Sequence, residues 1–289
     1  MKKFTVTIIM IWSIMMNAQD NTFKIYDSQL EAVEFNTVLE KAKKSDMVFF
    51  GETHNSTVAH KIQLQLAIDL TEFAGERLVI GAEMFERDNQ LIIDEYMADF
   101  FDDAKFEADA RLWPNYRTDY RPLLKWAKEN KIRFIATNAP RRYASMVSRD
   151  GFNALEKLSD EAKTYIADLP IKFDPQLTCY KTMMIGLKEK IHGNINPENL
   201  AKAQALKDAT MAMSILQNYK KGDLFYHING NYHTYNKEGI VWHIRQSEQD
   251  TEIFTISVIE ADNIRKLPDG YKNKADVIIA IPKRSPRSY

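Results

Sequence analysis

The sequence predicts an α/β protein, in which a mainly parallel sheet is flanked by helices and carries a smaller helical cap subdomain. Apolar runs of strand length recur along the chain, at residues 47–50, 78–82, 132–136, 224–228, 253–259 and 277–281. Helical patterns fill much of the sequence between them, and this alternation is typical of βαβ units around a parallel sheet. Polar side chains also follow several runs directly, as they do where α/β proteins bind ligands beyond the carboxyl ends of their strands.

The N-terminal segment has the features of a secretory signal. A basic pair, Lys2-Lys3, precedes an apolar run over residues 4–16, and Asn17-Ala18-Gln19 follows this run. The run is shorter than the roughly 20 apolar residues that span a bilayer. We therefore expect export and cleavage after Ala18, so that residues 1–18 form a signal peptide.

The amino-acid composition indicates which binding partners and which cellular compartment to expect. The chain has 289 residues, of which 45% are hydrophobic, and 39 basic residues balance 40 acidic ones. The hydrophobic content predicts a hydrophobic core of substantial size. The balanced charge argues against a nucleic-acid partner, because proteins that bind nucleic acids need a basic surface. The single cysteine, Cys179, cannot form an internal disulfide, and we expect a small buried thiol. No Cys follows the predicted signal, so we expect a periplasmic or cell-surface protein that is not lipid-anchored through an N-terminal Cys.

The strand expected at residues 47–50 leads directly into Gly51-Glu52-Thr53-His54. Asn55-Ser56-Thr57 then offers side chains that can cap a helix, and apolar residues recur at helical spacing from Val58 to Leu70. His54 is therefore expected at a turn between a strand and a helix, beside the ligand-binding edge of the sheet.

Two long segments have helical patterns and no strand pattern of their own. Aromatic and acidic residues are frequent from about residue 88 to 130, whereas methionines and interrupting prolines mark about 153–219. Within a single domain of residues 19–289, we expect parts of both segments to form the helical cap over the sheet edge.

Acid, imidazole, amide and guanidinium groups follow four of the predicted strands. In chain order these residues are Glu52 and His54, then Glu83 and Arg87, then Asn138 and Arg141, and then His233. Because the carboxyl ends of parallel strands share one edge, we expect these side chains to meet in one crevice. A Gly-x-x-His arrangement occurs both at Gly51 to His54 and at Gly230 to His233, and this repetition favours a functional site.

Each group also has a structural explanation. Glu52 and His54 would be explained by helix capping. Arg87, one helical turn after Glu83, would neutralise that carboxylate and make it purely structural, because an unpaired buried carboxylate is costly. His227 falls inside a strand pattern and is expected to be a hydrogen-bonded core histidine.

Several motifs in one order point to a known family. They occupy residues 48–54 with His60 and Gln63, 81–87, 113–120, 136–141, 207–212 and 230–233. With these motifs the chain resembles the ChaN-type haem-binding uptake proteins. Those proteins belong with the Tiki proteases and the erythromycin esterases in a superfamily marked by Glu and paired Gly-x-x-His motifs. The resemblance runs from about Tyr26 to Ile244, which is most of the mature chain.

The resemblance implies an exported protein of iron or haem acquisition, with haem as its cofactor between the α/β crevice and the helical cap. It implies a tyrosine ligand to the haem iron, for which Tyr116 and Tyr120 are candidates, with Asn138 and Arg87 as further cofactor-binding residues. Ordinary aromatic packing beside Trp113 is the alternative for both tyrosines. The implied partners are haem or another small molecule, a second copy of the chain, and outer-membrane uptake machinery.

A hydrolase, either an esterase or a metal-dependent peptidase, is the second function that these residues allow. Glu52, His54, Glu83 and His233 would then hold a divalent metal with a free position for water, or act as a metal-free acid and base pair with His54 as general base. The sequence leaves open whether the protein is an enzyme. A third alternative is an exported interaction module, which is disfavoured because paired acids in one crevice need a ligand, a metal or shared protons.

Overall fold

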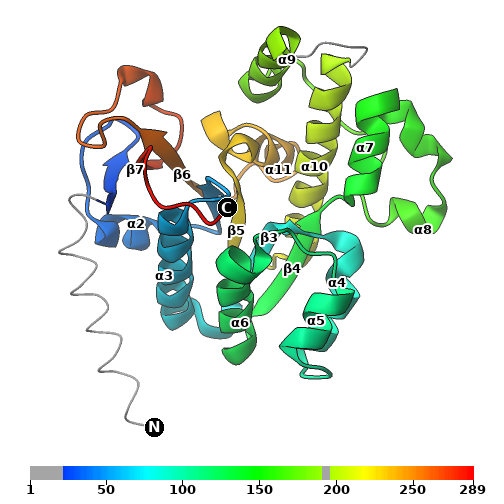
Figure 1. The fold of residues 1–289 in the computed structure, drawn as a ribbon, viewed down its shortest axis with the longest axis horizontal. Coiled ribbons are helices and arrows are strands. Elements are labelled where there is room, and N and C mark those ends of the chain that lie inside the picture. The colour runs from blue at the N-terminus through cyan, green and yellow to red at the C-terminus, as the bar shows by residue number, and fades with distance from the viewer. Residues whose placement is uncertain (1–21, 191–195) are drawn as a thin grey trace.

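The computed structural model describes residues 22–190 and 196–289, so the predicted signal peptide lies outside the described residues. Seven strands form one sheet in the order β1-β7-β6-β2-β5-β3-β4 (Figure 1). The strands are β1 (Lys24–Asp27), β2 (Met47–Glu52), β3 (Leu78–Glu86), β4 (Arg133–Asn138), β5 (Leu224–Gly230), β6 (Ile253–Ala261) and β7 (Val277–Pro282). β1 is antiparallel to β7, and the other neighbouring pairs are parallel. The predicted α/β class with a mainly parallel sheet is confirmed.

Helices connect most of the parallel strands, as is usual for crossover connections, whereas the segment between β6 and β7 contains only a 3-10 turn (Asp269–Tyr271). In chain order they are α2 (Phe35–Ala42), α3 (Thr57–Ala74), α4 (Gln90–Met97), α5 (Asp103–Asp109), a π-helix (Tyr116–Tyr120), α6 (Arg121–Glu129), α7 (Arg141–Asp150), α8 (Asp160–Lys163), α9 (Thr178–Lys190), α10 (Pro197–Asn218) and α11 (Ile240–Arg245). Among the described residues, no helix is long and apolar enough to span a membrane.

The sheet is covered on both faces, which is why its strands appear in the sequence as continuous apolar runs. β2 shows the alternation of side chains. Val48 and Phe50 pack in the cluster that contains α3 and α6, whereas Met47 and Phe49 pack in the cluster that contains α10 and α11. Every residue of β2 is buried. Burial on two faces therefore fixes the strand in the centre of the core.

The turn after β2 forms as the sequence predicts. Ser56 caps α3, and its hydroxyl accepts a hydrogen bond from the Ala59 amide at 3.1 Å. Val58, Ile62 and Leu66 lie on the buried face of this helix. His54 thus lies between the carboxyl end of β2 and the start of α3, at the edge of the sheet.

The two segments predicted as a cap pack differently. Helices α4, α5 and α6 contribute to the main core cluster beside β3 and β4. Helix α7, the segment that follows it, and part of α10 form a separate cluster, and α9 packs with α10 in another. Figure 1 shows α7, α8 and α9 at the periphery, beyond the strand ends. A helical cap formed by parts of residues 88–130 and 153–219 stays a prediction.

Candidate functional site

The carboxyl ends of β2, β3, β4 and β5 meet at one edge of the sheet. Glu52 at the end of β2 pairs in register with Gly230 at the end of β5. The Gly230 amide donates a hydrogen bond to Glu83 Oε2 at 2.7 Å. Asn138 at the end of β4 donates through Nδ2 to the Glu83 carbonyl oxygen at 2.9 Å. The structure therefore brings together polar groups from four strand ends that are far apart in sequence.

Glu52 is a buried carboxylate whose two oxygens both accept hydrogen bonds. Oε1 accepts from the Tyr120 hydroxyl at 2.7 Å and from His54 Nδ1 at 2.9 Å, and Oε2 accepts from Gln63 Nε2 at 2.6 Å. The His54 side chain is 35% exposed. Burial opposes a charge on this ring, but the hydrogen bond to Glu52 and the nearby carboxylates outweigh burial and raise the pKa of His54. Glu52 thus orients an imidazole that solvent can still reach.

His233 lies between two buried carboxylates. Its Nε2 is 3.1 Å from Glu83 Oε1, and its Nδ1 donates to Asp208 Oδ1. Burial disfavours the charged ring, but the charges of Glu83 and Asp208 outweigh it and raise the pKa of His233 to about 10. Desolvation also opposes the charge on Glu83, yet the imidazolium holds the pKa of that carboxyl well below its usual range. At neutral pH the site therefore contains a buried imidazolium between two carboxylates.

Asp208 was not among the predicted site residues. It lies on α10, is fully buried, and accepts a hydrogen bond from the Tyr180 hydroxyl of α9 at 2.8 Å. The residue stands within one of the motifs of the family resemblance, and its neighbours Leu206 and Ala209 are also buried. An acid on the buried face of a helix was the available signal, because such an acid needs a cationic or donor partner.

Gly230 has a packing reason to be glycine. A Cβ atom at this position would lie 2.7 Å from His54 Nε2 and 3.5 Å from Glu83 Oε2. A side chain here would push His54 away from the strand ends. The glycine of the second Gly-x-x-His motif therefore allows the His54 ring to lie directly over the end of β5.

The four side chains predicted as metal ligands do not fit a divalent cation in this arrangement. Both nitrogens of His233 face carboxylate oxygens, Nε2 that of Glu83 and Nδ1 that of Asp208. Both oxygens of Glu52 already accept hydrogen bonds. Within residues 22–190 and 196–289, no group of three or more His, Cys, Asp or Glu side chains is arranged to hold a metal ion. Metal ligands must be free to coordinate, whereas the imidazole nitrogens of His233 and the carboxylate oxygens of Glu52 are already paired within the protein.

The two tyrosines predicted as haem ligands are buried. Tyr120 is 2% exposed and its hydroxyl is committed to Glu52. Tyr116 is 3% exposed and its ring packs against Phe85 and Phe106. Burial raises the pKa of both phenols, and the Glu52 charge raises that of Tyr120 further. In this conformation neither phenol faces a ligand at the surface.

Arg87 does not neutralise Glu83, so that structural explanation is wrong. Its side chain points toward α10, where Nη1 donates to Ser214 Oγ at 2.6 Å. His233 provides the positive charge beside Glu83 instead. The pairing was expected because Arg87 follows Glu83 at the spacing of one helical turn. Glu83 lies in an irregular part of β3, however, and Arg87 comes just after this strand, so helical spacing does not apply.

His60, His227 and Cys179 are buried residues outside the cluster of Glu52, His54, Glu83 and His233. His227 is a fully buried core histidine, as predicted, and it hydrogen bonds to Thr137 Oγ1 at 2.8 Å. Burial lowers the pKa of His227 to about 4. His60 is buried beside the site, where its Nε2 donates to the His54 carbonyl oxygen at 3.0 Å. Cys179 is buried, as predicted.

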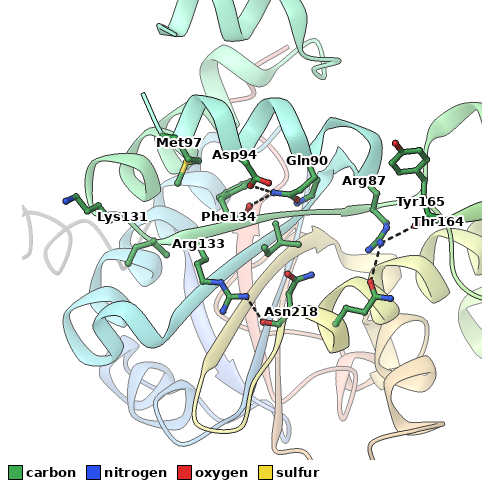
Figure 2. A pocket seen from close by; sticks show the side chains of 15 residues that line it. Arg87, Gln90, Asp94, Met97, Lys131, Arg133, Phe134, Thr164, Tyr165 and Asn218 are labelled. Carbon is green, nitrogen blue, oxygen red and sulfur yellow. Dashed lines mark hydrogen bonds between the residues drawn. The ribbon is translucent and has the colours of Figure 1, made fainter. Parts of the chain in front are cut away.

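A second feature is a cavity of about 740 Å³ along β4, the edge strand of the sheet (Figure 2). Helix α4 and the segment after α8 form its walls, so both helical segments predicted as a cap contribute to it. Figure 2 shows Arg87 and Tyr165 at one end and Lys131 at the other. The Gln90 side chain lies in the cavity wall and pairs with the free edge of β4, donating to the Phe134 carbonyl at 3.0 Å.

The fold and these features define an α/β protein with a buried acid and imidazole cluster at the carboxyl edge of a parallel sheet and a cavity at its β4 side. The family model described as "Haem-binding uptake, Tiki superfamily, ChaN" matches residues 38–244. The chain belongs to this family, and the resemblance inferred from its motifs is confirmed.

Two solved structures and one curated protein are similar to this chain. One similar structure is that of ChaN from Campylobacter jejuni, which was solved with haem bound cofacially. It is 17% identical in sequence and superposes with a TM-score of 0.69, and the match covers 89% of this chain and 96% of the Campylobacter protein. A Bacillus cereus protein is 12% identical with a TM-score of 0.53, covering 92% and 96%. The chloroplastic protein RETICULATA-RELATED 5 of Arabidopsis thaliana is 23% identical over 212 residues. That match covers 68% of this chain but only 29% of the plant protein.

Proposed function

We propose that this protein binds haem for haem or iron uptake, and that the haem lies in the cavity along β4. The family is one of haem-binding uptake proteins. The observation that carries the proposal is the combination of groups in one cavity, because haem is a flat apolar ring that bears two carboxylates and an iron atom. The cavity offers apolar and cationic side chains and one phenol, together with the Asp94 carboxylate, which accepts a hydrogen bond from Gln90.

The size and the walls of the cavity suit such a ligand. Its volume of about 740 Å³ falls within the range of roughly 300–1,000 Å³ that is usual for cofactor sites. Met97 and Ile135 are partly exposed and contribute apolar surface. Methionine adapts to the outline of an irregular ligand, which favours a tight contact with a large ring.

Tyr165 is the phenol that lines this cavity, and its side chain is partly exposed. It replaces Tyr116 and Tyr120 as our candidate for the iron ligand, since both of those residues are buried. When haem is bound, its iron supplies a Lewis-acidic centre that a phenolate oxygen can hold, and tyrosine is a known axial ligand of haem proteins. Met97 would cover part of the ring and exclude water from it.

Haemin titration of the purified protein tests this proposal. A saturable Soret shift is expected for the wild type, and no saturation at micromolar haemin would contradict haem binding. The Tyr165→Phe variant should lose the spectrum of a tyrosine-ligated ferric haem. The matched Tyr116→Phe variant should keep it, because that ring makes only packing contacts. If Tyr120→Phe alone removes the spectrum, the ligand lies at the strand ends and the cavity assignment is wrong.

Export, assembly and uptake partners belong to the same proposal. We propose cleavage of residues 1–18 and a homodimer in which two haems are held, since the Campylobacter jejuni protein binds haem cofacially. N-terminal sequencing of the mature protein tests the cleavage. Light scattering with and without haemin tests the dimer. An uptake role predicts that a strain without the gene grows poorly when haem is the iron source.

A hydrolase is the second function, and one specific observation favours it. His54 combines partial exposure with a hydrogen bond from Nδ1 to a buried carboxylate, which is the arrangement of a general base and its orienting acid. The reaction would be a metal-free hydrolysis in which His54 removes a proton from water. An ester and peptide substrate screen that compares wild type with His54→Ala tests it. Equal, negligible turnover by both proteins would count against an enzyme.

A further inference from the structure

Arg87 differs from the arginines around it because it has no carboxylate partner among the residues that the structure describes. Arg111 and Arg141 both pair with Glu86, and Arg142 pairs with Asp88. Within the part of the chain that the structure describes, no ion pair involves Arg87. A cation that is partly buried without a counter-ion is costly, so its presence calls for an explanation.

The hydrogen bonds of this guanidinium are all to neutral groups. Nη1 donates to Ser214 Oγ at 2.6 Å, and Nη2 lies 3.2 Å from both the Thr164 carbonyl oxygen and Gln217 Oε1. The buried Nε has no hydrogen-bond partner among the described residues. Burial lowers the pKa of Arg87, and no carboxylate offsets this effect. The site therefore holds a positive charge that the protein itself leaves uncompensated.

The position of this charge connects it with the cavity along β4. Arg87 lines the cavity at the end where Tyr165 also lies (Figure 2). Arg133, the other arginine in the cavity wall, is already engaged by Asp223 at 3.3 Å and by the Asn218 carbonyl oxygen at 2.9 Å. Lys131 is exposed, so water can solvate its charge. Arg87 is thus the cavity cation that gains most from an anionic ligand.

We propose that Arg87 is the anion subsite of the β4 cavity and that it binds a carboxylate of the ligand. The inference rests on the proposed function, under which this carboxylate is a propionate of haem. Guanidinium and carboxylate groups form strong paired hydrogen bonds because their geometries match. A carboxylate here would compensate the charge, and it would select ligands that carry an acid at the edge of an apolar ring.

Haemin and its dimethyl ester separate this inference from haem binding itself, because the ester keeps the ring and the iron but has no carboxylate. Wild-type protein should bind haemin about tenfold or more tightly than the ester, as a charge-assisted contact implies. The Arg87→Met variant should bind both porphyrins with similar affinity. The Arg87→Lys variant keeps the charge and should retain part of the preference.

Arg133→Met is the matched control, since Arg133 lines the same cavity but is already paired, and it should keep the preference for haemin. Circular dichroism and thermal unfolding establish that each variant folds. The comparison of haemin with its dimethyl ester on the wild-type protein does not depend on the folding of any variant. Equal affinity of wild type for haemin and ester would overturn the inference and leave haem binding intact. Absence of a Soret change with both porphyrins would overturn the proposed function and this inference together.

Discussion

Replacing His233 with glutamine should destabilise the protein strongly, because it removes the cation between two buried carboxylates. The side chains of Glu83 and Asp208 are only 5% and 1% exposed. Removing one partner from a buried ion pair costs about 3–5 kcal/mol. For a domain of this size, each kcal/mol lowers Tm by about 2–4 °C, so we expect a decrease of roughly 6–20 °C near neutral pH.

The stabilisation that His233 and Glu83 provide depends on pH, and the direction follows from the shifts in their pKa values. The pKa of His233 is raised from 6.5 to about 10 in the folded protein, so its contribution is complete below about pH 6.5 and is lost as the pH rises toward 10. The pKa of Glu83 is lowered, so its contribution is present above about pH 4.5 and is lost only in strong acid. In His233→Gln the buried Glu83 carboxylate loses the cation that lowers its pKa, so the variant would gain stability as Glu83 takes up a proton at lower pH.

The difference in stability between wild type and His233→Gln should therefore be largest near neutral pH and narrow toward both about pH 5 and about pH 9. Urea unfolding of both proteins across this range measures it. The control is His54→Gln, whose side chain is 35% exposed and should cost no more than about 1 kcal/mol. The reasoning is refuted if His233→Gln unfolds within about 1 kcal/mol of wild type at every pH.

Two further predictions use matched pairs of variants. Tyr120→Phe removes a donor to the buried Glu52 carboxylate and should lower the free energy of unfolding by about 1.5–3 kcal/mol, whereas Tyr116→Phe, which loses no hydrogen bond, should cost less than about 0.5 kcal/mol. Equal losses in denaturant unfolding would contradict the role given to the Tyr120 hydroxyl. Gly239→Ala should cost more than about 2 kcal/mol, because Gly239 has φ +56° and a Cβ there would collide with a backbone carbonyl. Gly186→Ala, in open space on α9, should be neutral or stabilising, and Tm values that fall alike for both glycines would count against this view.

The sequence predicted the sheet well because strands buried on two faces leave a distinct pattern. β2 and β3 are apolar along most of their length and are buried throughout, so their runs could be recognised without any partner. The sequence does not predict β1, because this edge strand has only four residues and only its two central residues, Ile25 and Tyr26, are buried. An edge strand of this length carries too few apolar positions for a pattern.

The candidate site divides in the same way. Glu52, Glu83, Asn138 and His233 could be expected to meet, because parallel strands deliver their carboxyl ends to one edge. The role of Asp208 could not be expected, because it enters from a helix whose orientation against the sheet is set by packing. The sequence showed which acids and imidazoles share the edge, but it could not show which of them pair.

By itself the sequence determined the α/β class, the order of most strands along the chain, the family, and the residues gathered at the carboxyl edge. These follow from local periodicity and from a general rule of parallel sheets. Only the tertiary structure decided that His233 neutralises Glu83, that Tyr120 donates to Glu52, and that Arg87 lines a cavity and has no carboxylate partner in the described part of the chain. Such pairings depend on distances of a few ångströms between distant segments, and the packing of whole helices on the sheet sets those distances.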